Sequence, residues 1–134
     1  MKKILVTIAI LAVLAAGGYY YYQYQKEHKD NPKEAAIEQL AEQTVETKQI
    51  STNLHSDNLI QVKFSIELDS KKTKKQSEEI ISILESDIIK ILSQSQKDDF
   101  KDIATMEEKI KTKLNERMAQ GKVINVYTTE LLIQ

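Results

Sequence analysis

Few residues of this chain could carry out chemistry, and those that could are far apart. The two histidines, His28 and His55, are distant in sequence, and neither has a carboxylate at a spacing typical of metal ligands. The chain contains no cysteine, which excludes a thiolate nucleophile and a disulfide framework. The sequence therefore predicts neither a bound metal nor a cofactor.

Acids and serines are the remaining candidates for catalysis. Asp98 and Asp99 are adjacent, so their side chains diverge on any regular element. Ser93 and Ser95 have no base nearby in sequence and lie in no G-x-S-x-G motif. The chain also lacks a G-x-x-x-x-G-K phosphate-binding loop. We therefore predict a protein that is not an enzyme.

The charge balance excludes one class of partner. Nineteen lysines and arginines face twenty acidic residues, for a net charge of −1. A nucleic-acid-binding domain needs a basic stripe to neutralise phosphates, and this composition does not supply one. Nucleic acid is therefore not an expected partner.

The densest group of cations lies at the expected start of a helix. It consists of Lys71, Lys72, Lys74 and Lys75. Four cations there oppose the helix dipole. A charge run of this kind is usually a solvated turn, and the alternative is a docking surface for an acidic partner or an anionic wall polymer. The four lysines are therefore a candidate partner interface.

An uncharged segment, residues 4–22, dominates the N-terminal region. As a helix it reaches ~28 Å, close to the ~30 Å hydrocarbon core of a bilayer. Lys2 and Lys3 precede it, which predicts a cytoplasmic N-terminus and an extracytoplasmic remainder. A cluster of tyrosines forms an aromatic belt at its end. The residues that represent this predicted membrane anchor are Ile4, Leu11, Leu14, Tyr19 and Tyr22.

A cleaved signal peptide is the alternative for the same segment. The basic start, the apolar run and the small residues 15–18 fit that pattern as well. The apolar run is longer than the ~7–15 residues usual for a signal core, and tyrosines are unusual directly after a cleavage site. In either case the rest of the chain is expected outside the cytoplasm.

Charged residues begin abruptly after the tyrosines and divide the chain into three parts. We expect a cytoplasmic tip and anchor at 1–24, a partly helical linker at 25–44 and an extracytoplasmic domain at 45–134. In the linker, Asn31 and Pro32 predict a helix N-cap and first turn. A thin apolar stripe then predicts a solvated spacer helix, with self-association of copies along it as the alternative.

Two strands are predicted at the start of the domain. Apolar and polar residues alternate strictly over 59–69, which is typical of an antiparallel strand with one buried face. A weaker alternation over 49–54 predicts a second strand, and residues 55–58 have the composition of a turn. The two strands are expected to form a hairpin.

Two helices are predicted after the hairpin. Residues 73–92 have helical periodicity, with isoleucines and leucines on one face. Thr105 and Glu108 have the spacing of a capping box, which predicts the start of the second helix at Thr105. Gly121 is expected to provide the left-handed C′ position after that helix.

The last predicted strand, 122–134, has apolar residues on both of its faces. Strict alternation places Val123, Tyr127, Leu131 and Ile133 on one face and Ile124, Val126 and Leu132 on the other. This pattern indicates an inner strand or an interface. The candidates for core or subunit interface are Tyr127, Leu131 and Ile133, together with Phe64 of the hairpin.

The element order β-β-α-α-β predicts an α+β fold. Its small antiparallel-rich sheet is expected to carry two helices on one face, after the N-terminal transmembrane helix and the linker helix.

Three segments resemble one known family. Residues 51–69 resemble its "TNL…IQVSI.LE" hairpin, and residues 88–100 resemble a helix followed by an "LSSKT…DL" loop. Residues 121–134 resemble its closing "GKV..VYFTEFVVQ". The family is the flagellar basal body-associated FliL family, and the resemblance covers nearly the whole chain.

The resemblance implies a single-pass inner-membrane protein at the flagellar basal body, with an outer domain similar to the stomatin/SPFH fold. It implies association with a MotA/MotB-type stator and the rotor membrane ring, and assembly as a ring around the stator. We therefore predict an accessory protein that oligomerises around the stator and supports torque and motility. The alternative is a membrane-anchored or secreted envelope binding module unrelated to the flagellum.

Overall fold

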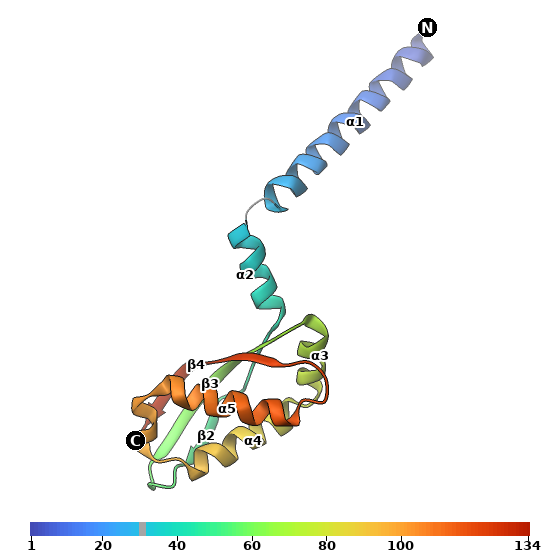
Figure 1. Cartoon of the computed structure of the whole chain (residues 1–134). Coiled ribbons are helices and arrows are strands. Elements are labelled where there is room, and N and C mark those ends of the chain that lie inside the picture. The colour runs from blue at the N-terminus through green and yellow to red at the C-terminus, as the bar shows by residue number, and fades with distance from the viewer. Residues whose placement is uncertain (30–31) are drawn as a thin grey trace. The chain divides into compact units, whose positions relative to one another are not determined.

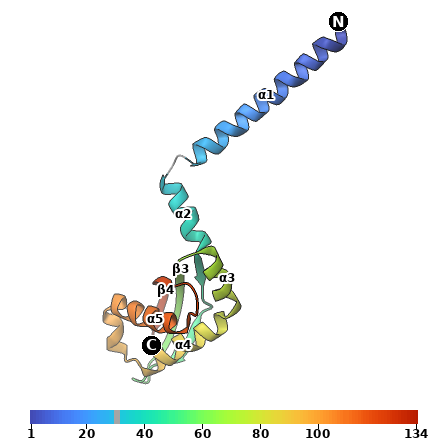
Figure 2. The ribbon, with the colours of Figure 1, turned by 45° about the vertical axis from the view of Figure 1, so that its right-hand side comes forward.

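The computed structural model describes the backbone of residues 1–29 and 32–134 (Figures 1 and 2). These residues form two compact units, Met1–Gln39 and Leu40–Gln134. The predicted N-cap Asn31 lies outside the described residues.

The first unit is helical. α1 spans Lys2–Lys29, and its part Lys2–Glu27 is the one helix among the described residues that is long and apolar enough to cross a membrane. α1 thus continues beyond Tyr24 into the first charged residues that follow the apolar segment. The predicted linker helix is confirmed as α2, Pro32–Glu42.

The sheet of the second unit is built around one long strand, β3, Leu59–Leu68. β1, Thr44–Glu46, and β2, Ile50–Asn53, both pair with one side of β3, and β4, Val123–Ile133, pairs with the other side. Every pairing is antiparallel. The hairpin of β2 and β3 is confirmed, whereas β1 was not predicted because three residues are too few to show an alternation.

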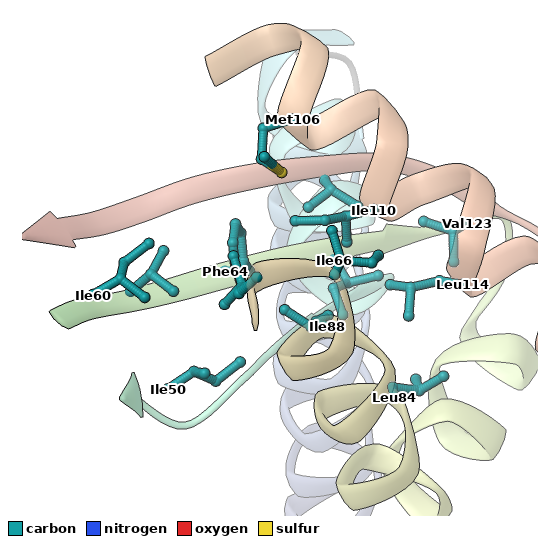
Figure 3. Close-up of a cluster of buried hydrophobic side chains, with 14 of the residues drawn as sticks. Ile50, Ile60, Phe64, Ile66, Leu84, Ile88, Met106, Ile110, Leu114 and Val123 are labelled. Carbon is teal, nitrogen blue, oxygen red and sulfur yellow. The ribbon is translucent and has the colours of Figure 1, made fainter. Parts of the chain in front are cut away.

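The hydrophobic core lies on one face of β3 (Figure 3). The strict alternation of β3 is confirmed, since every second side chain is at most 1% exposed. These side chains are Ile60, Val62, Phe64, Ile66 and Leu68. Their burial removes apolar area from water and contributes roughly 1.5–3 kcal/mol for each fully buried side chain.

Helices cover this face of the sheet. They are α3, Lys71–Glu79; α4, Ile81–Gln94; and α5, Ile103–Arg117, with a short 3-10 helix, η1, Lys97–Lys101. α4 contributes Leu84 and Ile88 to the core, and α5 contributes Ile110 and Leu114 (Figure 3). The α+β class and the antiparallel sheet with helices are therefore confirmed.

The prediction of a single helix over 73–92 is wrong in one respect, because the helix is interrupted at Ile80 and forms α3 and α4. The φ angle of Ile80 is −114°, and its N–H donates to the carbonyl of Ser77 at 3.2 Å. The buried residues Thr73 and Ser77 before the break and Leu84 after it continue one helical stripe. Because this stripe passes through the break, the periodicity gave no sign of it.

The capping box predicted at Thr105 is also wrong. Asp102 is the N-cap of α5, and its carboxylate accepts from the N–H of Thr105 at 3.2 Å and from its hydroxyl at 2.7 Å. Thr105 is thus a donor to the cap rather than the cap itself. An aspartate fills this role well because its ionised oxygens satisfy N–H groups that have no partner within the helix.

Gly121 adopts the predicted left-handed conformation, with φ +76°, but it is not the C′ residue directly after α5. α5 ends at Arg117 with Met118 as its C-cap, so Gly121 lies in the turn that leads to β4. A Cβ at this position would lie 2.1 Å from the Oγ1 of Thr73. Both the backbone angle and the contact with α3 therefore require glycine.

Candidate interaction surface

Two bulges decide which side chains of β4 face the core. The register of β3 with β4 shifts between Lys63 and Phe64 and again between Glu67 and Leu68. At these shifts Thr129 and Ile124 have no directly paired residue in β3. Each extra residue reverses the alternation of the strand that follows it.

The bulges explain the apolar residues on both predicted faces of β4. The core-facing residues of β3 are paired with Val123, Val126, Thr128, Leu131 and Ile133. The outer face of the sheet instead receives Tyr127 and Leu132, which pair with Ser65 and Gln61. The predicted grouping of side chains by strict alternation is therefore wrong, and β4 is an edge strand rather than an inner one.

The four apolar interface candidates lie in different surroundings. Phe64 is 1% exposed and belongs to the core, and Ile133 packs half-buried against it. Tyr127 is 41% exposed and Leu131 is 36% exposed. Of these four, Tyr127 and Leu131 thus offer substantial side-chain surface to a partner.

Tyr127 belongs to a polar cluster on the outer face of the sheet. Its hydroxyl donates to the carboxylate of Glu67 at 2.7 Å, and the amide of Asn125 donates to the same oxygen at 2.9 Å. The hydrogen bond to Glu67 raises the pKa of Tyr127, because the carboxylate stabilises the protonated phenol. This cluster fixes the orientation of the tyrosine ring on an exposed surface.

Side chains of α5 close the first half of the free edge of β4. The amide of Asn115 accepts from the N–H of Val123 at 2.8 Å and donates to its carbonyl at 3.0 Å. The carboxylate of Glu107 accepts from the N–H of Thr128 at 2.7 Å. These bonds satisfy backbone groups that a neighbouring strand would otherwise bind.

The second half of this edge has no such closure. Leu59 and Gln134 exchange two backbone hydrogen bonds, at 3.1 and 2.9 Å, which identifies them as a hydrogen-bonded pair of the ladder. In an antiparallel ladder the N–H and C=O groups of successive residues point alternately toward and away from the paired strand, so those of Leu131 and Ile133 point away from β3. These outward N–H and C=O groups form no hydrogen bond with another described residue. We call residues 131–133 the open edge.

The lysine cluster of α3 is partly neutralised. Lys71 forms an ion pair with Glu42 at 2.6 Å, and Lys74 lies 3.7 Å from Glu78. Lys72 and Lys75 are exposed and form no ion pair with a described residue. The cluster therefore presents two uncompensated cations as a candidate partner interface.

A groove between α4 and α5 is a surface that sequence reasoning missed. It has a volume of about 510 Å³, and Ile91 lies in its lining. Lys90, Lys109 and Lys113 line it together with one acid, Glu116, which pairs with Lys113 at 3.0 Å. Its lysines come from two helices, so no local sequence signal could have revealed it.

An ion pair between a buried aspartate and a partly exposed arginine joins α4 to the end of α5. The side chain of Asp87 is 2% exposed, and its carboxylate accepts from both Nε and Nη2 of Arg117, the latter at 3.0 Å. Lys90 donates to it at 3.3 Å. The bonds from Arg117, more than those from Lys90, lower the pKa of Asp87 despite its burial. The pair joins α4 and α5, two of the helices that cover the sheet.

Among the described residues, no three His, Asp or Glu side chains converge as a metal-binding group. His55 lies exposed in the turn between β2 and β3. The features that stand out are thus surfaces: the open edge, the polar cluster around Tyr127, the lysine cluster and the groove.

Comparison with known proteins gives two matches. A family model described as "Flagellar basal body-associated protein FliL" matches residues 44–134. The flagellar protein FliL of Bacillus subtilis (strain 168) is 29% identical over 124 residues, which cover 90% of this chain and 87% of that protein. The family match spans every strand of the domain and α3, α4 and α5.

Proposed function

The chain belongs to the flagellar basal body-associated FliL family, and from this membership we propose that it supports the stator of the flagellar motor. The observation that carries the proposal is the family match over the whole folded domain, preceded by one apolar helix that fits a membrane anchor. The family is one of flagellar accessory proteins and not a known enzyme family.

The proposed location is the cell membrane at the basal body, with the N-terminus in the cytoplasm and the domain outside. Lys2 and Lys3 before the apolar helix support this orientation, because positive charge is retained on the cytoplasmic side. The tyrosines that end the apolar segment suit the opposite membrane interface. The anchor would hold the domain beside integral membrane proteins of the motor.

The proposed mechanism is a shift in the population of stator states. Copies of the domain, in a stomatin/SPFH-like arrangement, would surround the stator and contact the rotor membrane ring. An assembly that binds only the engaged stator stabilises that state by its difference in affinity between the two states. Tyr127 and Leu131 are exposed, as are all of the lysine cluster except the half-buried Lys74, and they support contacts to copies or to the stator.

Crosslinking in motile cells tests this proposal. A photoreactive residue would replace Lys74 or, separately, Tyr127 in the full-length chain, and mass spectrometry would identify the products. Ser86, an exposed residue of α4 outside both surfaces, is the matched control position. We expect crosslinks to stator subunits and to other copies from Lys74 and Tyr127, and far fewer from Ser86.

Two outcomes would contradict the proposal. Self-crosslinks without any motor protein, in a strain whose torque is unchanged when the chain is deleted, would indicate an envelope module unrelated to the flagellum. Recovery of a chain that lacks α1 from the medium would show that the apolar helix is a cleaved signal rather than an anchor.

A further inference from the structure

We propose that the groove between α4 and α5 binds a short acidic segment of another protein, with an apolar side chain of that segment placed over Ile91. This assignment rests on the proposed function, because the stator of the flagellar motor is the proposed partner. It adds the chemistry of the segment that the groove would bind.

The groove is basic because both helices supply lysines to it. Lys90 comes from α4, whereas Lys109 and Lys113 lie four residues apart on one face of α5. All three are exposed, and Lys109 forms no ion pair with a described residue. The exposed acid of the lining, Glu116, pairs with Lys113 at 3.0 Å. The lining therefore keeps an excess of positive charge that carboxylates of a partner can neutralise.

The buried acid beside the groove does not cancel this charge. The side chain of Asp87 is 2% exposed, and it binds Arg117 as well as Lys90, whose Nζ lies 3.3 Å from it. Two cations thus share one carboxylate, which lies below the surface. A partner that approaches the groove meets the exposed end of Lys90 and not the acid beneath it.

The floor of the groove is apolar. Ile91 is 6% exposed and belongs to the hydrophobic core. The methylene stems of the surrounding lysines add apolar surface below their charged ends. A groove of about 510 Å³ with such a floor suits an apolar side chain flanked by carboxylates. Apolar anchors surrounded by polar contacts are typical of peptide-binding grooves.

Acidic residues limit the basic region at both of its ends. At one end, Lys109 lines a neighbouring hollow with three aspartates, Asp98, Asp99 and Asp102. Beyond the other end, Glu79 lines a hollow with Arg117, the last residue of α5. A long anionic polymer would meet these like charges and would place no apolar group on the floor of the groove. Both observations favour a short protein segment over an anionic wall polymer.

Crosslinking from within the groove tests its occupant. Gln94 is exposed, uncharged and part of the lining, so a photoreactive residue at this position removes no cation. It would be placed in the full-length chain in motile cells, and mass spectrometry would identify the attached peptide. Ser51, an exposed residue of β2 outside the lining, is the matched control position. We expect position 94 to capture a segment of another protein that carries acids around an apolar residue, and Ser51 not to capture it.

Reversal of charge tests how the segment is recognised. Lys109→Glu with Lys113→Glu changes two exposed positions of a helix to another good helix former, so the domain should still fold. Like charges would then meet across the contact, and we expect capture by position 94 to fall about tenfold or more. Lys48→Glu with Lys97→Glu is the matched control, because both lysines are exposed and lie outside the lining. It should leave capture unchanged.

A reciprocal change in the captured segment excludes misfolding as the cause of a loss. Replacing its carboxylates by lysines should restore capture by the chain that carries Lys109→Glu and Lys113→Glu. The same lysine segment should not be captured by the chain with the native groove. Restored capture requires a folded groove whose charge is recognised.

Four results would overturn the inference. Capture of nothing but other copies of this chain would show that a second copy fills the groove. A phosphate polymer attached to position 94 in place of a peptide would show the wall polymer instead. Capture no stronger than from Ser51 would show an empty groove. Equal capture with and without Lys109→Glu and Lys113→Glu would show that acidity is not recognised.

The outcomes separate this inference from the proposed function. Stator crosslinks from Lys74 and Tyr127, with none from position 94, would refute the groove and leave the motor role intact. Charge-dependent capture by position 94 of an envelope protein outside the motor, with no stator crosslink from any position, would refute the motor role and leave the groove intact.

Discussion

The two halves of β4 belong to one strand and both pair with β3, but only the first half is hydrogen-bonded to side chains of α5. Asn115 and Glu107 bind the edge of the first half, at Val123 and Thr128. The open edge receives no such contact and exposes Leu132 and Leu131 instead. The accessibility of an edge strand is thus set by side chains of a different element and not by the strand itself.

The largest expected effect comes from the turn that leads into the closed half. Gly121→Ala must adopt φ +76° and place its Cβ 2.1 Å from the Oγ1 of Thr73. We expect the free energy of unfolding to fall by about 2–5 kcal/mol, from the left-handed backbone and the overlap together. Urea denaturation of the purified chain measures this loss.

The double variant Gly121→Ala with Thr73→Ala is the control for this prediction. It removes the Oγ1 and Cγ2 atoms that the new Cβ would meet, so part of the stability should return. The part that does not return reports the backbone angle, the remaining 2.9 Å approach to the Cβ of residue 73 and the lost hydrogen bond from Thr73 to Asp69. A Gly121→Ala chain as stable as the native one would contradict the account of this turn.

An intermediate effect is expected from pH, through the ion pair that holds α5 in place. The pKa of Asp87 is lowered below 3.8 in the folded chain, chiefly by Arg117, so the unfolded chain binds protons more readily. The stability from this pair is therefore complete well above pH 4 and lost as the pH falls through the folded pKa. Denaturation at a series of pH values measures this loss.

Asp87→Asn separates this pair from other carboxylates, such as Asp102, whose pKa is also lowered. We expect the variant to lose about 1–3 kcal/mol near neutral pH, since bonds to a charged group are broken. Its stability should then change less between pH 5 and pH 3 than that of the native chain. Equal pH dependence in both chains would exclude Asp87 as a source of the acid sensitivity.

The smallest effect is expected from removing the hydrogen bond by which Glu107 closes the first half of β4. Glu107→Ala removes the carboxylate that accepts from the N–H of Thr128 and should cost about 1 kcal/mol. The amide hydrogen of Thr128 should then exchange with solvent nearly as fast as that of Leu131. Glu108→Ala is the matched control, because Glu108 pairs with Lys111 on the surface and does not bind β4.

Slow exchange at Thr128 in Glu107→Ala would show that something other than this carboxylate protects the first half. Fast exchange at Thr128 in the native chain would show that the two halves do not differ in solution. The first result would change the account of what protects the first half, and the second would remove the contrast between the two halves of β4.

Much of the fold could be predicted from local patterns. The alternation of β3 identified its buried residues, and the periodicity of 73–92 identified the apolar face that holds Leu84 and Ile88. Asp102 was missed because several residue types cap helices, and the choice depends on where the chain leaves the previous element. The break at Ile80 was missed because the apolar stripe continues through it.

The candidate site could be predicted only in part. Tyr127 and Leu131 were singled out by composition, and both are exposed. Their faces were not predictable, because the bulges that place Tyr127 outside and Leu131 inside arise from pairing with β3. Lys90 lies in a groove that α4 and α5 form together, which no local window contains.

The sequence by itself determined the apolar helix, most elements of the domain, the buried face of β3 and the family. These depend on the period and composition of contiguous residues, which reflect burial directly. Only the tertiary structure decided that α5 closes half of β4, that Asp87 pairs with Arg117, and that residues 131–133 remain open. The reason is physical: hydrogen bonds across an edge join residues far apart in the chain, and their geometry exists only after the helices have packed on the sheet.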